Sequence, residues 1–157
     1  MYDVRLFAPM ILGFGVSSLC PIQSNEGSIL PQRPPSFVFG IVWPILFMLV
    51  GYSWTRSKGK ANILMTFLVF LLTFWTFVFS CIGNQKIALY ILACILGTTI
   101  GCMILLSHHA KVSMIALIPL LSWCFLAFLL NWDIVDWNYC HFGDSPICLG
   151  FTNPIVA

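Results

Sequence analysis

The chain has 157 residues, of which 60% are hydrophobic and only 8% are charged, and its formal net charge is +2. Soluble domains carry about 25% charged residues, so this composition excludes an ordinary soluble globular protein and indicates a single-domain membrane protein. The sequence also lacks a basic patch with interleaved aromatic residues, so it gives no indication of nucleic-acid binding.

The few charged residues divide the sequence into apolar stretches of membrane-spanning length. Five intervals contain no Asp, Glu, Lys or Arg: 6–25, 34–55, 61–85, 87–110 and 112–132. A helix needs about 20 apolar residues to cross a hydrocarbon core of about 30 Å. Because lipid offers the backbone no hydrogen-bond partner, the stretches predict an all-α membrane protein, a bundle of five transmembrane helices. The expected spans, which make up a domain over 1–132, are 6–22, 36–54, 62–82, 87–107 and 112–132.

The first apolar stretch has two interpretations, a retained helix and a cleaved signal peptide. Its start is nearly neutral because Asp3 offsets Arg5, and no small-residue cleavage site follows cleanly. We therefore interpret it as a retained transmembrane helix.

The second stretch, PPSFVFGIVWPILFMLVGYSW, begins abruptly and is rich in aromatic rings. Its two leading prolines favour a helix start, because proline fits a first turn, where its missing N–H has no intrahelical partner to lose. Phe39, Trp43 and Phe47 recur every four residues and therefore lie on one side of the helix. Pro44 predicts a bend beside Trp43.

The third and fourth stretches carry further residues at helical spacing. Trp75 and Phe79 are four residues apart, and Ala93, Gly97 and Gly101 recur every four residues around the GxxxG pattern GTTIG. Small residues allow another helix to approach closely. We expect this small-residue face to pack inside the bundle, with a homodimer face as the alternative.

The fifth stretch, IPLLSWCFLAFLLNW, places Pro119, Trp123, Ala127 and Asn131 four residues apart, roughly on one side of a helix. An amide near the end of a span needs a partner from protein, water or ligand. Taken alone, each of these stripes is explained by ordinary helix packing.

Basic residues favour one side of the membrane. With five spans, one side holds five of the seven lysines and arginines, namely Arg5, Arg56, Lys58, Lys60 and Lys111. The positive-inside rule then predicts a cytoplasmic N-terminus and a C-terminus on the opposite side. The sequence does not distinguish the outer mitochondrial membrane, another organelle and the plasma membrane.

The tail, 133–157, contains three aspartates but no lysine or arginine, and we expect a short segment at the membrane surface. Cys140 and Cys148 are close enough in sequence to pair if that side is oxidising. Together with His141 and Asp144 they fit no standard zinc spacing, so no metal site is predicted. His108 and His109, near Lys111, are expected to interact with the dipole of a helix C-terminus.

Taken together, the motifs resemble those of the TspO/translocator-protein family, which includes tryptophan-rich sensory proteins and mitochondrial benzodiazepine receptors. PPSFVFGIVWPILFMLVGY is similar to the family's PP-x-W-x-F/L-G/A-P-x-W-x-x-L-Y, which opens helix 2. PLLSWCFLAFLLN is similar to P-Y-x-x-W-x-x-x-A-x-x-L-N in helix 5, and FWTFVF to W-x-x-x-F-F in helix 3. Length, number of spans and motif order agree up to about residue 132.

The resemblance implies a bundle with an aromatic-lined pocket for a flat hydrophobic ligand, foremost a porphyrin or haem, in tetrapyrrole transport or stress sensing. No obligatory cofactor is expected. Trp43 and Phe47 are expected to lie across from Trp123 and Ala127, and Asn131 to hydrogen-bond the ligand. The ligand-binding residues expected in this way are Phe39, Trp43, Phe47, Trp75, Phe79, Pro119, Trp123, Ala127 and Asn131.

Three other functions stay open beside tetrapyrrole binding. They are a sterol or lipid carrier with the same pocket, a structural partner that binds no ligand, and an enzyme acting on porphyrin. The enzyme is disfavoured because no Asp, Glu, Lys or Arg lies inside a predicted span.

The sequence also departs from the family pattern. The loop EGSILPQRPP lacks the family's tryptophan, Leu72 stands where helix 3 has asparagine, and the tail lacks the aromatic–basic sterol motif of mammalian members. These departures argue against light-driven porphyrin degradation and the mammalian mode of cholesterol binding, but leave the pocket residues in place.

Overall fold

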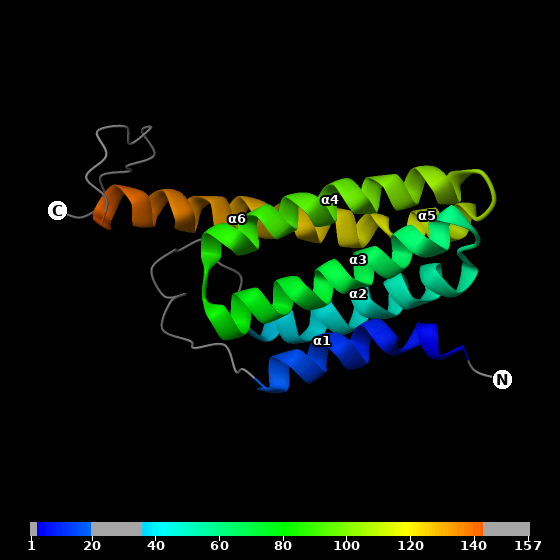
Figure 1. Cartoon of the computed structure of the whole chain (residues 1–157), viewed down its shortest axis with the longest axis horizontal. Helices are drawn as coiled ribbons and strands as arrows, with labels where there is room; N and C mark the ends of the chain where they lie inside the picture. The colour runs from blue at the N-terminus through cyan, green and yellow to red at the C-terminus, as the bar shows by residue number, and fades with distance from the viewer. Residues whose placement is uncertain (1–2, 20–35, 143–157) are drawn as a thin grey trace.

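The computed structural model describes residues 3–19 and 36–142, and the described part is helical apart from short connections. Four long helices lie side by side along one axis (Figure 1). They are α2 (Ser36–Arg56), α3 (Lys60–Phe77), α4 (Gln85–Ser107) and α6 (Ile118–Phe142). Shorter pieces complete the bundle: η1 (Val4–Leu6), α1 (Ala8–Leu19), the π-helical η3 (Val78–Ile82) and α5 (Lys111–Ala116).

Four stretches are long and apolar enough to cross a membrane: Phe37–Arg56, Lys60–Ile82, Gln85–Ser107 and Lys111–Trp132. They match the second to fifth predicted spans to within a few residues. The first predicted span, 6–22, corresponds to α1, whose twelve residues extend about 18 Å and fall short of a hydrocarbon core. The described residues thus contain four full-length spans and a shorter apolar helix, rather than five full-length spans.

Glycine and asparagine set the turns between the helices. Gly59, before α3, has φ of 53°, and Gly83, after η3, has φ of 67°, a left-handed conformation that side chains other than glycine rarely adopt. The Gly83 N–H donates to the Val78 carbonyl at 3.0 Å and ends the π-helical turn. The Asn84 side chain then accepts from the Ile87 N–H at 3.1 Å and caps the start of α4.

The last span is interrupted near its start and continues further than predicted. Pro119 has no N–H to donate to the Ile115 carbonyl, which explains why α5 and α6 are separated at Leu117. Beyond the predicted end at residue 132, α6 continues to Phe142 and projects past the other helices (Figure 1). The first part of the predicted surface tail is therefore a continuation of α6, whereas Cys148 and the rest of the tail lie outside the described residues.

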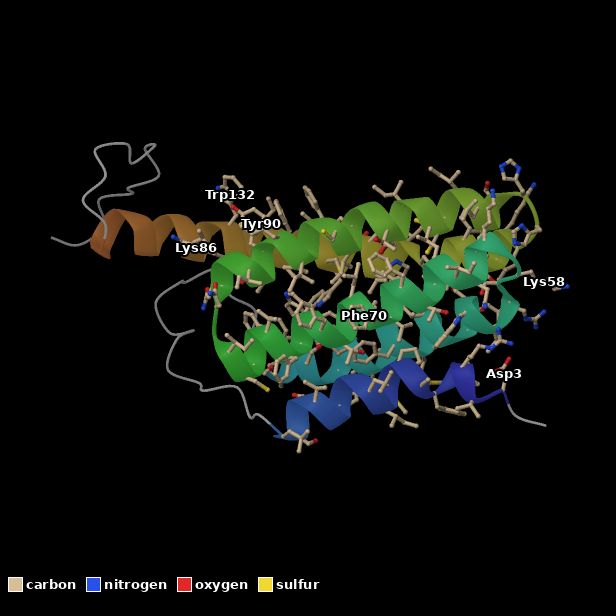
Figure 2. All side chains as sticks on the ribbon, viewed as in Figure 1. Asp3, Lys58, Phe70, Lys86, Tyr90 and Trp132 are labelled. Atoms are coloured by element: carbon tan, nitrogen blue, oxygen red, sulfur yellow. The ribbon has the colours of Figure 1, made fainter. Side chains whose placement is uncertain are left out.

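The N-terminal segment is attached to one end of the bundle. The Arg5 guanidinium donates to the Asp3 carboxylate and, at 3.1 Å, to Oδ1 of Asn62 at the start of α3. The hydrogen bonds and charge of Arg5 hold the pKa of Asp3 below its usual value. Asp3 and Lys58 lie at this end of the bundle, which we call the basic end, and Lys86 and Trp132 lie at the other (Figure 2).

The core lies where α4 packs against α3 and α6. Its fully buried side chains are mainly aliphatic and come from all three helices, including Met65, Leu68, Leu92, Ile95 and Leu120. Close packing of these aliphatic side chains excludes lipid from the centre and holds the three helices together.

We expected the small-residue face to pack inside the bundle, but only one of its three residues does so. Ala93 and Gly97 are exposed, and a Cβ added at Gly97 would meet nothing within 4 Å. Only Gly101 lies against a neighbouring helix, where an added Cβ would be 3.1 Å from Cδ2 of Leu64. The reason is geometric: α3 and α6 are packed on the other sides of α4, so residues 93 and 97 point outward.

Candidate functional site: an aromatic stack and a groove between α2 and α6

Four of the predicted ligand-binding residues form one continuous stack of rings. Trp43 and Phe47 come from α2, Trp75 from α3 and Phe79 from η3; we call these four the aromatic stack. The ring centroids of Trp43 and Phe47, of Trp43 and Trp75, and of Trp75 and Phe79 are each 5.3 Å apart, and the rings are tilted by 20° to 33°. These distances lie in the favourable range for aromatic pairs.

The aromatic stack is largely enclosed by the bundle. Phe47 and Trp75 are buried, with 4% and 7% of their surfaces exposed, and Trp43 and Phe79 are half-buried. On one side α1 covers it, since Phe14 contacts Phe47 edge-on at 6.1 Å. Gly13 makes room for this contact, because a Cβ there would lie 2.5 Å from the Phe47 ring. The short helix α1 thus serves as a wall of the site.

Trp123 occupies a different position from the one expected. The sequence predicted Trp43 and Phe47 across from Trp123 and Ala127, but Trp43 packs against Trp75 of α3 instead. Trp123 contacts Phe39, with centroids 5.5 Å apart and an edge-to-face angle of 70°. Trp43 faces Trp75 of α3, whereas Phe39, one turn earlier on α2, faces Trp123 of α6. The predicted residues therefore form two neighbouring groups rather than two facing rows.

Several polar groups in this region are buried without a hydrogen bond. The indole N–H groups of Trp75 and Trp123 have no acceptor among the described residues, and the same holds for Trp54 nearer the basic end. Asn131 is also buried, with 4% of its surface exposed, as is Ala127 beside it on α6. An unpaired donor inside a membrane is unfavourable because no water replaces the missing acceptor. A bound molecule that reached these indole N–H groups would find donors without partners among the described residues.

A groove of about 370 Å³ lies between α2 and α6. Its walls are apolar apart from the Ser122 side chain, and the Trp123 ring is part of them while its indole N–H is buried. The lining side chains are Val42, Ile45, Leu46, Pro119, Ser122, Trp123 and Leu126. Two of the predicted residues, Pro119 and Trp123, are among them, and Trp123 connects the groove to Phe39 and hence to α2 near the aromatic stack.

Sequence reasoning missed most of the groove. Ser122 and Leu126 follow Pro119 at spacings of three and seven residues, which is the spacing of one helix face, so α6's contribution had a readable signal. Ile45 and Leu46 had none, because an aliphatic residue in a span is equally compatible with core, lipid and groove. The two walls form one groove because α2 and α6 are neighbours. A single sequence does not show which helices are neighbours.

Acid–base and metal chemistry find no support in the described residues of this region. None of the side chains of the aromatic stack or the groove is an acid or a base, and the described residues contain no cluster of three or more metal-ligating side chains. Cys81, in η3, is disulfide-bonded, whereas Cys94, Cys102 and Cys124 are free. The arrangement is suited to binding a flat, mainly apolar molecule.

The sequence profile of the TspO/MBR family matches residues 9–137. The chain belongs to the TspO/MBR family. The match covers α1 to most of α6, including every residue of the aromatic stack and of the groove. With its four apolar helices of spanning length, this TspO/MBR protein is an integral, multi-pass membrane protein. Comparison with curated proteins finds no match to this TspO/MBR chain.

Proposed function

We propose that this TspO/MBR protein binds a flat hydrophobic tetrapyrrole, a porphyrin or haem, at the aromatic stack and Trp123, and serves tetrapyrrole transport or stress sensing. The observation that supports it most directly is the pair of buried indole N–H groups without acceptors, on Trp75 and Trp123. A tetrapyrrole offers a planar ring for stacking and carboxylate groups that accept hydrogen bonds. It therefore combines the two features, a flat face and acceptor groups, that the rings and the unpaired donors call for.

The geometry of the aromatic stack supports a planar ligand over a compact one. Its three ring pairs have the same 5.3 Å spacing and small tilts, so the four ring faces are roughly aligned, and each ring covers part of its neighbour. A planar molecule gains dispersion and apolar burial from such faces over its whole area. Ligand sites of this kind combine mostly apolar walls with a few polar groups that fix orientation.

The groove favours a second candidate, a sterol or lipid carrier. Its walls are apolar, with one hydroxyl, that of Ser122, and with the ring of Trp123. A sterol has a single hydroxyl as its polar group and no flat conjugated ring to stack against the aromatic residues. Tetrapyrrole binding is therefore the first proposal, and a sterol is the competitor to include in the binding experiment.

The test is a spectral titration of the purified protein with protoporphyrin and with haem, with cholesterol as competitor. We expect a shifted Soret band that saturates. Trp123→Ala should weaken binding by about 1–3 kcal/mol, the scale of a lost buried aromatic contact, without unfolding the protein. Trp132→Ala is the matched control, because Trp132 lies on the same helix but is 56% exposed.

Two results would contradict the proposal. The first is the absence of a saturable Soret change in the wild-type protein, which would favour a structural partner that binds no ligand. The second is displacement of the porphyrin by stoichiometric cholesterol, which would favour the sterol carrier. Equal porphyrin affinities of the Trp123→Ala variant and the wild-type protein would show that Trp123 is not part of the binding site.

A further inference from the structure

The groove between α2 and α6 opens sideways. Its residues lie at 42–46 and 119–126, inside the spans Phe37–Arg56 and Lys111–Trp132 rather than at their ends. The rim residues Ile45, Ser122 and Leu126 are exposed, whereas Leu46 is buried at the floor. In a bilayer this opening faces hydrocarbon, not either aqueous phase.

The opening has a structural cause. Near the basic end α2 is held to α5, where the Ser53 hydroxyl donates to the Ser113 carbonyl at 3.0 Å. Further along, α6 packs against α4 and makes few contacts with α2. Pro119 adds only a short ring to the wall at the point where α6 begins. The two helices therefore leave a gap that no described side chain fills.

The floor of the groove leads to the proposed site. Trp123 lines the groove and contacts Phe39 edge-on at 5.5 Å, and Phe39 lies one helical turn from Trp43 of the aromatic stack. The Trp123 indole N–H has no acceptor among the described residues. A molecule that enters the groove from the lipid therefore meets the ring of Trp123, whose unpaired indole N–H is buried.

We propose that the planar ligand reaches the site from the bilayer, through the groove between α2 and α6. This rests on the proposed tetrapyrrole binding and adds the route. At about 370 Å³ the groove is near the lower limit of small-molecule sites, so it holds an edge of the ligand while the rest is still in lipid. A flat hydrophobic molecule partitions into hydrocarbon, so its local concentration is highest where the groove opens.

The test measures the rate at which protoporphyrin, supplied in protein-free vesicles, reaches the protein in vesicles, followed by the Soret shift. Ile45→Phe and Leu126→Phe each narrow the mouth from one side. Because the added ring overfills the groove, association of the porphyrin should be about tenfold slower. The equilibrium affinity should change little, since dissociation is slowed as well. Ile100→Phe on α4 is the matched control, since Ile45 and Ile100 are 55% and 48% exposed.

The outcomes separate the route from the binding. Slow association in both groove variants with a wild-type rate in Ile100→Phe supports the route. Wild-type rates in folded groove variants overturn it while leaving tetrapyrrole binding intact. The route is also overturned if the groove variants lose a co-purified acyl lipid while porphyrin associates at the wild-type rate, because the groove then holds a lipid tail. It is likewise overturned if they lose a dimer at the wild-type rate, because the groove then holds a second copy. No Soret shift in wild-type protein overturns both proposals.

Discussion

Gly51 of α2 is the residue at which the N-terminal segment approaches the bundle most closely. A Cβ at this position would overlap the backbone carbonyl of Leu6, just after Arg5, whose side chain is tied to Asn62 of α3. Backbone cannot rotate out of the way as a side chain does. The absence of a side chain at residue 51 is therefore a condition for η1 and α1 to lie against α2.

We predict that Gly51→Ala lowers the stability of the protein. The steric overlap should cost about 1–3 kcal/mol, which exceeds the gain of up to about 1 kcal/mol from higher helix propensity. Gly40→Ala is the control on the same helix, because an added Cβ there meets nothing within 4 Å. Melting curves in one detergent should show a lower midpoint for Gly51→Ala and an equal or higher one for Gly40→Ala; an unchanged Gly51→Ala would mean that η1 moves aside freely.

At the scale of the helices, α4 presents two kinds of glycine. Gly97 faces outward with open space beside it, whereas Gly101 faces Leu64 of α3. We predict that Gly97→Leu leaves the melting temperature of the monomer unchanged or raised, because leucine has the higher helix propensity. Gly101→Leu should lower it, because the larger side chain must displace Leu64.

The same pair of variants tests whether two copies meet at α4. If Ala93 and Gly97 form a dimer face, Gly97→Leu shifts the assembly to monomer at unchanged monomer stability, because a close helix contact needs small residues. Size measurement in detergent, beside the melting curves, separates the two effects. A loss of monomer stability in Gly97→Leu would show that residue 97 packs inside the bundle after all.

The helices were predictable where composition determines them and less so at their ends. Apolar length located α2, α3 and α4, and Pro119 explains the interruption between α5 and α6. The continuation of α6 to Phe142 was missed because Asp133 marks the edge of the apolar stretch, and a helix continues beyond that edge without difficulty. The turns before α3 and α4 were not predicted, although Gly59, Gly83 and Asn84 are residue types that favour such positions.

The ring contacts within one helix were predictable from the sequence, but the contacts between helices were not. Four-residue spacing placed Trp43 with Phe47 and Trp75 with Phe79, and the stack contains both pairs. Which helix faces which depends on packing across the whole bundle. For that reason the contact of Trp43 with Trp75, and of Trp123 with Phe39, emerged only in the structure.

At the scale of the whole molecule, the basic residues and the projecting end of α6 mark opposite ends of the bundle. Asp3 and Lys58 lie at the basic end, and α6 ends at the other (Figure 2). The positive-inside rule predicts that the basic end faces the cytoplasm. We predict that an epitope inserted beside Lys58 and one at the C-terminus are reached by antibody from opposite sides of sealed vesicles. Access to both from one side would contradict this topology.

The last prediction concerns a reaction that this protein should not perform. In helix 3 the family has an asparagine where this chain has Leu72, which is 1% exposed and packed in the aliphatic core. No tryptophan occurs in the loop that precedes α2. A planar ligand should still bind, because dispersion and apolar burial depend on the aromatic rings rather than on these two residues. Its polar edge should be oriented less well.

Rate enhancement depends on orientation far more steeply than affinity does, since a small misplacement of the reacting atoms costs orders of magnitude in rate. We therefore predict saturable protoporphyrin binding with no light-driven degradation beyond that of free protoporphyrin. The measurement is absorbance during illumination, with and without the protein, and Leu72→Asn tests whether the amide restores any reaction. Fast, protein-dependent loss of protoporphyrin to a defined product, abolished in Trp123→Phe, would show that the rings alone orient the ligand well enough for catalysis.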